Sequence, residues 1–324
     1  TGRFYESVNL ATRFNFNPSN RFFLEPVFQY NHWDYLSTED IFDTRSQPFA
    51  LDRTDRKLGL VLGIGTGKRS VIRWENAFIR NSESYSNVPG ISSSEILDDL
   101  QFRGVKSKFT YERNSLNKKQ FPTQGSRFFS SLKWITGDFD FTPGSTSVNY
   151  DPVNDDIFSQ DQNWFNLKVK FDEYSQISEK YSFGWSFEGQ YSTISALANY
   201  RGSLLYLPAF EPLFDSKTYF LEDFRAPGYL ALGMKHIWEL ADSFYLRGEL
   251  YAFSSFRTLA QAPLQTSDFN NGFQSPRLMG MAAFIYETLA GPISARINYL
   301  QGNTTPVGLM LSFGYLIFNE KSNH

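Results

Sequence analysis

Few residues in this chain of 324 residues have the types and spacing that catalysis requires. A serine hydrolase with a nucleophile elbow needs Gly-x-Ser-x-Gly, and the segment Gly90-Ile91-Ser92 lacks the closing glycine. The segment GIGTGKRS at residues 63–70 imitates a phosphate-binding loop but departs from that motif around Arg69 and Ser70. This segment is better explained as the end of one strand, a tight turn and the start of a second strand. We therefore predict no catalytic residue in this chain.

Metal and cofactor sites are not indicated either. His32, His236 and His324 fall on separate expected elements and show no ligand spacing. The sequence has no cysteine, which removes disulfide frameworks and thiolate metal sites and fits a chain that passes through an oxidising periplasm. We predict no cofactor and no bound metal.

The composition is dominated by aromatic residues. They make up 18% of the chain, with 33 Phe and 18 Tyr, although the mean hydropathy is only -0.38. No run approaches the roughly 20 apolar residues of a transmembrane helix, which excludes a helical membrane protein. Abundant aromatics on weakly hydrophobic alternating strands are typical of a transmembrane β-barrel. The net charge of -3 gives no basic footprint for nucleic acid.

An alternation of period two identifies the strands. From Tyr181 to Ser192, large aromatic residues alternate with small polar ones, which predicts a strand with lipid on one face and a watery lumen on the other. Residues 278–287 match least well, because both faces are apolar. The same template predicts thirteen strands, at residues 3–14, 21–32, 57–65, 70–80, 101–112, 126–136, 164–174, 181–192, 229–239, 244–256, 277–287, 291–300 and 306–318. The expected fold is all-β, an antiparallel barrel over residues 1–318 with a short tail at 319–324.

The connections alternate in length, which predicts which end of the barrel faces the periplasm. The connections at 14–20, 66–69, 175–180, 240–243 and 288–291 are short, whereas those at 33–56, 81–100, 137–162, 193–228 and 257–276 are long. Bacterial barrels have short periplasmic turns and longer outer loops, so we expect a periplasmic C-terminus. The loop at 137–162 holds six Asp and no Lys or Arg, which indicates solvated surface or bridging through divalent cations to lipopolysaccharide.

The stretch from Ser195 to Gly228 is too long for a simple connector. It is rich in aromatic rings, unlike a disordered segment, so we expect it to fold inward and occlude the lumen. Charged residues on the polar strand faces are then either a solvated inner wall or anchors for this loop. They are Arg73, Glu75, Lys168, Lys170, Lys235, Glu239, Arg247 and Glu249.

Two turns of the sequence carry recognisable motifs, FPTQG, with Phe121, Pro122, Thr123 and Gly125, and Gly291-Pro292-Ile293. They resemble the F/Y-P-T-x-G turn and the G-P-I/L motif of the BamA/TamA outer-membrane assembly-factor superfamily. The resemblance covers about residues 100–318: an alternating strand follows FPTQG, then come two further strands and the long loop, and five strands follow the loop. It implies a sixteen-stranded barrel, of which three strands lie upstream of Thr1.

A narrower resemblance is carried by LPAFEPLFDSKTYFLEDFRAPGYLALG and by the ending FGYLIFNEKS, in which Phe313, Tyr315 and Phe318 belong to the terminal strand. These segments are similar to the C-terminal barrels of patatin-like phospholipases from Bacteroidota-type bacteria. In the wider superfamily an arginine of the inserted loop contacts an acidic residue on the inner wall. The resemblance implies a latch from Arg225, or otherwise Arg201, to Glu249.

These expectations define one function and its alternatives. The resemblance implies an outer-membrane barrel that anchors, and delivers or gates, an upstream patatin-like lipid acyl hydrolase. The alternative is an outer-membrane assembly or translocation factor, or an accessory subunit of an outer-membrane complex. An assembly factor should have a short or poorly paired last strand, whereas residues 307–318 read as one long strand. A diffusion porin is disfavoured by the aromatic loop. The expected partners are outer-membrane lipid, lipopolysaccharide and the upstream part of the same polypeptide.

Thirteen is an odd number of strands, and bacterial barrels close with an even number. We therefore expect the strand at 3–14 to pair with a strand supplied from upstream. Alternatively, further strands lie within 33–56 or 81–100 and restore the parity.

Overall fold

The structure is a computed structural model that describes residues 5–16, 21–34, 51–88, 95–154, 156–217, 219–302 and 306–315. Within these ranges, no helix is long and apolar enough to cross a membrane. Residues 90–92, Phe318, His324 and the predicted tail at 319–324 lie outside the described ranges.

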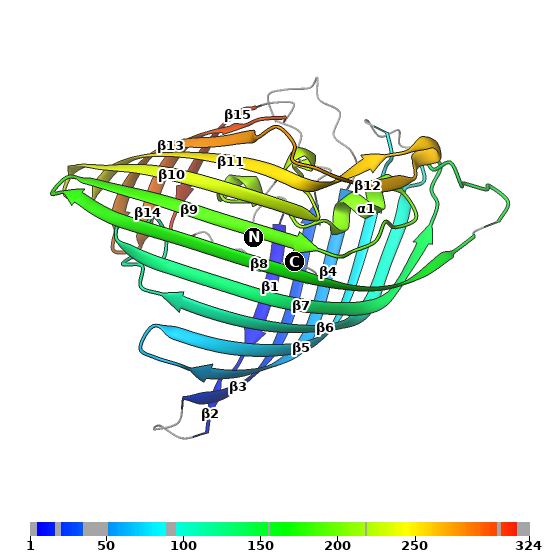
Figure 1. The fold of residues 1–324 in the computed structure, drawn as a ribbon, viewed down its shortest axis with the longest axis horizontal. Coiled ribbons are helices and arrows are strands. Elements are labelled where there is room, and N and C mark those ends of the chain that lie inside the picture. Colours follow the sequence, from blue (N-terminus) through cyan, green and yellow to red (C-terminus); the bar gives the residue numbers. More distant parts are fainter. Residues whose placement is uncertain are drawn as a thin grey trace.

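The described chain forms one antiparallel sheet of 15 strands that curves around a lumen. Figure 1 shows the strands in chain order from blue β1 to red β15, with the connection between β9 and β10 on the concave side. The strands are β1 (Tyr5–Ala11), β2 (Phe14–Asn15), β3 (Phe22–Asp34), β4 (Leu51–Gly65), β5 (Ser70–Tyr85), β6 (Asp98–Asn114), β7 (Gly125–Thr142), β8 (Phe158–Ser178), β9 (Tyr181–Ser192), β10 (Gly228–Ala241), β11 (Phe244–Gln261), β12 (Ser267–Asn271), β13 (Arg277–Thr288), β14 (Gly291–Leu300) and β15 (Val307–Phe313).

Thirteen of these strands form the continuous path of the sheet, and each matches one predicted strand in the same order. The fold class is therefore confirmed. The two additional strands are short: β2 continues the direction of β1 along β3, and β12 pairs with the far end of β11. The predicted strand at 3–14 is thus divided at residues 12–13, and β12 was not predicted.

Several strands run further than predicted at the end of the barrel that carries the long loops, here called the loop end. Strand β4 begins at Leu51, β5 continues to Tyr85, and β8 begins at Phe158. These extensions carry polar side chains outward, such as Ser159 and Asp161, so they lack the apolar alternation that marks a strand in lipid. Short hairpins at 66–69, 179–180, 242–243 and 289–290 define the opposite turn end.

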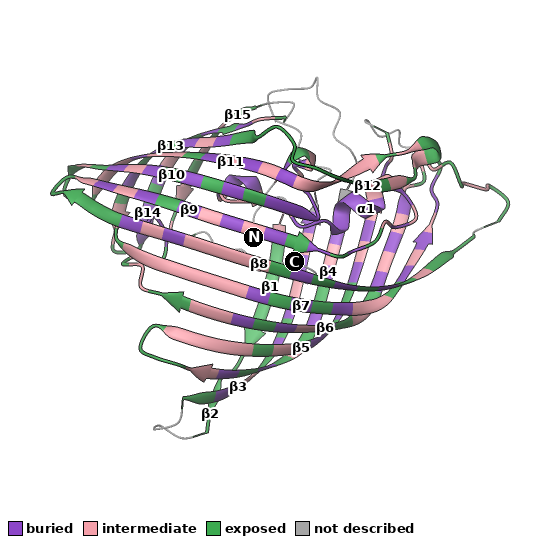
Figure 2. Ribbon diagram, viewed as in Figure 1, coloured by how far each residue is buried: buried purple, intermediate pink, exposed green. Residues whose placement is uncertain are grey.

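The wall alternates between a buried inner face and an exposed outer face, as predicted for β8, β9 and β14. Figure 2 shows this alternation as purple and green bands along the strands. The outward residues form an apolar belt far larger than the patches that water-exposed surfaces usually carry. It includes Leu58, Leu60, Leu62, Trp74, Phe78, Phe109, Leu132, Trp134, Phe165, Leu167, Trp185, Leu232, Met234, Phe284, Ile293, Ile297, Leu309 and Leu311.

Strand β13, the weakest match in the sequence, has an apolar inner face for a specific reason. Met279, Met281, Ala283 and Ile285 face inward and pack against aromatic residues of the loop between β9 and β10. An inner wall that contacts a packed loop needs no polar side chains, so the alternation disappears.

The two edges of the sheet are β1 and β15. Strand β1 pairs with β3 and β15 pairs with β14, and no pairing joins β1 to β15 in the part of the chain that the structure describes. Strand β15 ends at Phe313, where Gly314 adopts a φ of +82°. The strand was predicted to continue to residue 318, but Gly314 and Tyr315 are not part of it. Residues 316–318 lie outside the described ranges. Phe313 and Tyr315 are both exposed.

Candidate functional site

The connection between β9 and β10, residues 193–227, fills much of the lumen and is here called the inserted loop. It contains α1 (Tyr200–Tyr206), η1 (Asp215–Lys217) and η2 (Glu222–Phe224). Its inward fold confirms the prediction from its ring content. The loop contacts the wall in two separate regions, one through α1 and one through the segment after it.

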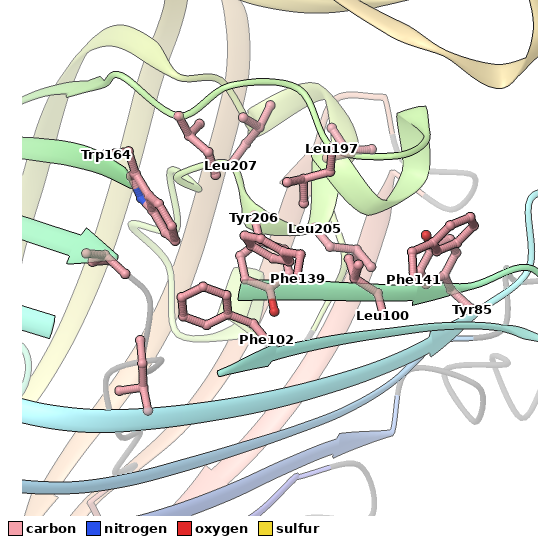
Figure 3. Packing of buried hydrophobic residues seen from close by; sticks show 14 of the residues in the cluster. Tyr85, Leu100, Phe102, Phe139, Phe141, Trp164, Leu197, Leu205, Tyr206 and Leu207 are labelled. Carbon is pink, nitrogen blue, oxygen red and sulfur yellow. The ribbon is translucent and has the colours of Figure 1, made fainter. Parts of the chain in front are cut away.

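The first region packs α1 against the inner face of β5–β8 near the loop end. Figure 3 shows Leu205, Tyr206 and Leu207 above rings that project from the wall. The ring of Tyr206 lies edge-on to Phe139, with 4.6 Å between centroids, and 6.1 Å from Phe102. Trp164 completes this cluster and is 1% exposed. Burial of several large rings makes docking of α1 strongly favourable.

Asn199 connects the start of α1 to the wall. Its side-chain oxygen accepts a hydrogen bond from the Gly202 N–H at 2.7 Å, which caps the helix. The same oxygen accepts from the Tyr85 hydroxyl at 2.8 Å, and its amide nitrogen donates to Asp98 at 2.8 Å. One side chain therefore ties the helix to both β5 and β6.

A buried charge network holds the other end of α1. Arg53 of β4 donates to the Leu205 carbonyl at 3.2 Å and lies 3.0 Å from Asp55. The Tyr206 hydroxyl donates to Glu83 at 2.8 Å. Arg53, Asp55 and Glu83 are each at most 2% exposed, so their mutual pairing is needed to offset desolvation.

The second region joins the inserted loop to β14 through an ion pair. Arg296 donates to both carboxylate oxygens of Asp215, at 2.9 and 3.2 Å, and Asn298 also donates to this carboxylate. Arg296 is held in place by hydrogen bonds to Ser294 and Ser312 at 2.8 and 2.9 Å. Planar, bidentate pairing of this kind is both strong and directional. In the sequence, Ser294, Arg296 and Asn298 alternate with apolar residues, which is the pattern of an inward polar face, but no such pattern marks Asp215.

The turn that resembles the superfamily motif enters the lumen from the turn end. Phe121 is 5% exposed, has a φ of 52°, and lies edge-on to Phe214 of the inserted loop at 5.6 Å. A positive φ is unusual for an aromatic residue and costs energy, so the surrounding contacts must hold it. Arg247 supplies one of them by donating to the Pro122 carbonyl at 2.9 Å.

The other two motif residues shape this turn. Thr123 forms two hydrogen bonds with the Asn117 carboxamide, at 2.9 and 3.1 Å. Gly125 has a φ of +97°, and a Cβ there would lie 2.2 Å from the Ser115 carbonyl oxygen. The turn therefore uses the hydroxyl of Thr123 for a hydrogen bond and the missing side chain of Gly125 for a close backbone approach.

The predicted latch to Glu249 does not form. Glu249 is bound on its own strand by Arg247 at 2.5 Å and by the Tyr251 hydroxyl at 2.6 Å. Arg225 lies 3.7 Å from Glu211 of the same loop, and Arg201 pairs with Glu222. The loop-to-wall ion pair at Asp215 has the opposite polarity, because its acid is on the loop and its arginine is on the wall.

Most of the remaining inward charges are paired with wall residues. Lys235 lies 2.8 Å from Asp172, Lys168 lies 2.7 Å from Glu188, and the Tyr229 hydroxyl also donates to Glu188 at 2.7 Å. Between the inserted loop and the Phe121 turn, Asp172, Glu188 and Lys235 line a cavity of about 220 Å³. This volume is below the roughly 300–1,000 Å³ of pockets that hold drug-sized ligands. The geometry is suited to closing the lumen.

Neither the family models nor the curated proteins include a match to this sequence. Among solved structures, the BamA protein of Haemophilus ducreyi lacking POTRA domains 1–3 aligns with a TM-score of 0.58 and 13% identity. The alignment covers 95% of this chain and 61% of that BamA chain. The fold is similar to that of the BamA barrel. The FrpB iron transporter of Neisseria meningitidis aligns with a TM-score of 0.38 and 12% identity, over 93% of this chain and 46% of that one.

Proposed function

We propose that this chain is a plugged barrel of the bacterial outer membrane that anchors a patatin-like hydrolase domain carried elsewhere in the same polypeptide. The apolar belt supports a position in lipid. In this proposal the loop end faces outward and the turn end faces the periplasm, because the longer connections gather at one end. The barrel holds the hydrolase at the membrane and delivers or gates it.

The observation that carries the proposal is the pinned inserted loop. It is bound through α1 to β4–β6 and through Asp215 to Arg296, and it meets Phe121 in the lumen. A channel for free diffusion has no use for a segment held at so many buried points. An anchor needs a rigid wall and no open channel, and these contacts hold the inserted loop firmly across the lumen.

The proposal includes further strands between β15 and β1. Each of these edge strands has one neighbour among the described residues, and unpaired backbone groups in lipid cost several kcal/mol each. We propose that strands upstream of Thr1 fill this gap, as the resemblance to a sixteen-stranded barrel implies.

The second candidate function is an assembly or translocation factor. Its support is the similarity to the BamA barrel and the brevity of β15, which has seven residues where thirteen were expected. A short last strand is suited to a weak seam at which other barrels are inserted.

Deletion of the part of the gene that encodes this barrel, with the rest of the gene kept, distinguishes the two functions. An anchor predicts that lipid acyl hydrolase activity moves from the outer-membrane fraction to the soluble fraction, while other outer-membrane barrels keep their abundance in quantitative proteomics. Loss of many other barrels from the membrane, with unchanged hydrolase activity, would favour the assembly factor.

A further inference from the structure

Three arginines lie side by side on the outer wall. Arg56 of β4 is directly opposite Arg80 of β5, and Arg80 is directly opposite Arg103 of β6. All three are exposed. Adjacent strands are about 4.8 Å apart, so the row spans roughly 10 Å. Like charges at directly opposed positions repel each other, so this row is unfavourable without an anion.

The protein supplies carboxylates at one end of this row. Arg103 pairs with Asp140 at 3.0 Å and is directly opposite Asp138 of β7, and the Arg103 side chain is still 60% exposed. In the part of the chain that the structure describes, Arg56 and Arg80 form no ion pair or hydrogen bond. Two adjacent guanidinium groups therefore point outward with their donors unused.

The position of the row indicates which anion it binds. Two residues toward the turn end, the same outer face carries Leu58, Phe78 and Val105, which are 61%, 70% and 37% exposed and belong to the apolar belt. Two residues toward the loop end it carries Thr54, Ser82 and Gln101, which are neutral and polar. The row thus marks the boundary of the belt, where lipid headgroups lie.

We propose that Arg56, Arg80 and Arg103 form a binding site for the phosphates of a membrane lipid whose acyl chains lie along Leu58, Phe78 and Val105. Guanidinium groups bind phosphate oxygens bidentately, and a row of them suits a headgroup with more than one phosphate. Because the loop end faces outward in the proposed function, on which this assignment rests, the lipid is the bisphosphorylated lipid A portion of lipopolysaccharide.

The test measures binding of fluorescent lipid A to the full chain in detergent micelles. The double variant Arg56→Gln/Arg80→Gln should weaken binding by roughly tenfold or more, because charge-assisted contacts are among the stronger hydrogen bonds. It should fold well, because the substitutions relieve repulsion. Arg113→Gln is the matched control, since Arg113 is also exposed and lies on the same face of β6 at the turn end. Its affinity should equal that of the unaltered protein.

Competition with unlabelled compounds shows whether the site binds lipid A, another phospholipid or free phosphate. Lipid A without phosphates and inorganic phosphate should both fail to displace the probe. Equal affinity of the double variant and the unaltered protein would overturn the site, and equal displacement by phosphatidylglycerol or by inorganic phosphate would overturn its assignment to lipid A. Labelling of Asn154→Cys on whole cells tests sidedness separately, because the micelle measurement does not depend on it.

Discussion

Asp215 and Arg296 are 81 residues apart in the chain and form a bidentate ion pair inside the barrel, with side chains that are 5% and 1% exposed. The pair joins the inserted loop to β14, the strand next to one edge of the sheet. Because α1 of the same loop is bound to β4–β6 on the other side, the loop bridges the lumen. It therefore fixes the curvature of the wall as well as closing the lumen.

Substitution of Asp215→Asn should destabilise the folded barrel strongly. It leaves the buried Arg296 without its carboxylate partner, and breaking a buried pair costs about 3–5 kcal/mol. Unfolding by urea in micelles, followed by the heat-dependent shift of the folded band, measures the loss. Asp223→Asn is the control in the same loop, because its pair with Arg277 is exposed and 3.5 Å long and should contribute about 0–1 kcal/mol. Equal effects of the two substitutions would show that Asp215 is no anchor.

Phe121 and Phe214 should be energetically coupled across the lumen. Removal of the Phe121 ring by Phe121→Ala should cost about 3–5 kcal/mol, as for other buried rings. In a double-mutant cycle with Phe214→Ala, the coupling should be about 0.5–1.5 kcal/mol. Phe109→Ala, on the outer face of β6, is the control and should change the unfolding free energy little in micelles. A coupling of zero would contradict the contact between turn and loop.

Asn199 should tolerate neither loss of its side chain nor addition of a charge. Asn199→Ala should cost about 0.5–2 kcal/mol through the helix cap alone. Asn199→Asp keeps a capping oxygen but places a carboxylate against the buried Asp98, so it should be at least as damaging. Limited proteolysis of the inserted loop measures both effects as faster cleavage. Normal protease resistance of Asn199→Asp would show that the contact with Asp98 does not hold α1.

Gly125 should be required by the turn at Phe121. Gly125→Ala forces a Cβ against the Ser115 carbonyl at a positive φ, so we expect a loss of more than about 1 kcal/mol. Gly248→Ala has open space around it and should be close to neutral. The two variants are compared by unfolding in urea, and similar stabilities would refute the steric argument.

The strands that cross the apolar belt could be predicted from sequence, because lipid imposes the alternation that period-two analysis detects. Beyond the belt this constraint ends. The outer face of β8 carries Ser159, Asp161 and Asn163 near the loop end, so the ladder continues through residues that read as an acidic loop. Strand β12 was not predicted because it also lies beyond the belt and lacks the apolar alternation.

The inward fold of the loop could be predicted from its rings, but its ion pair could not be assigned. Arg296 was recognisable as an inward charge on β14, and Asp215 is an acid within an apolar segment, LFDSK. Nothing in their spacing joins them, because the contact depends on how the loop crosses the lumen. The expected latch at Glu249 failed because Arg247, two residues away on the same face, is a nearer partner.

Ion conductance across planar bilayers tests the central claim most directly, namely that the inserted loop closes the lumen. We predict that the intact protein, including the strands proposed between β15 and β1, shows little steady conductance, and that replacement of residues 200–226 by a short Gly-Ser linker produces large and stable openings. Asp215→Asn should give an intermediate, flickering conductance because it releases one anchor. A wide, steady conductance of the intact protein that is unchanged when the loop is replaced would contradict the account.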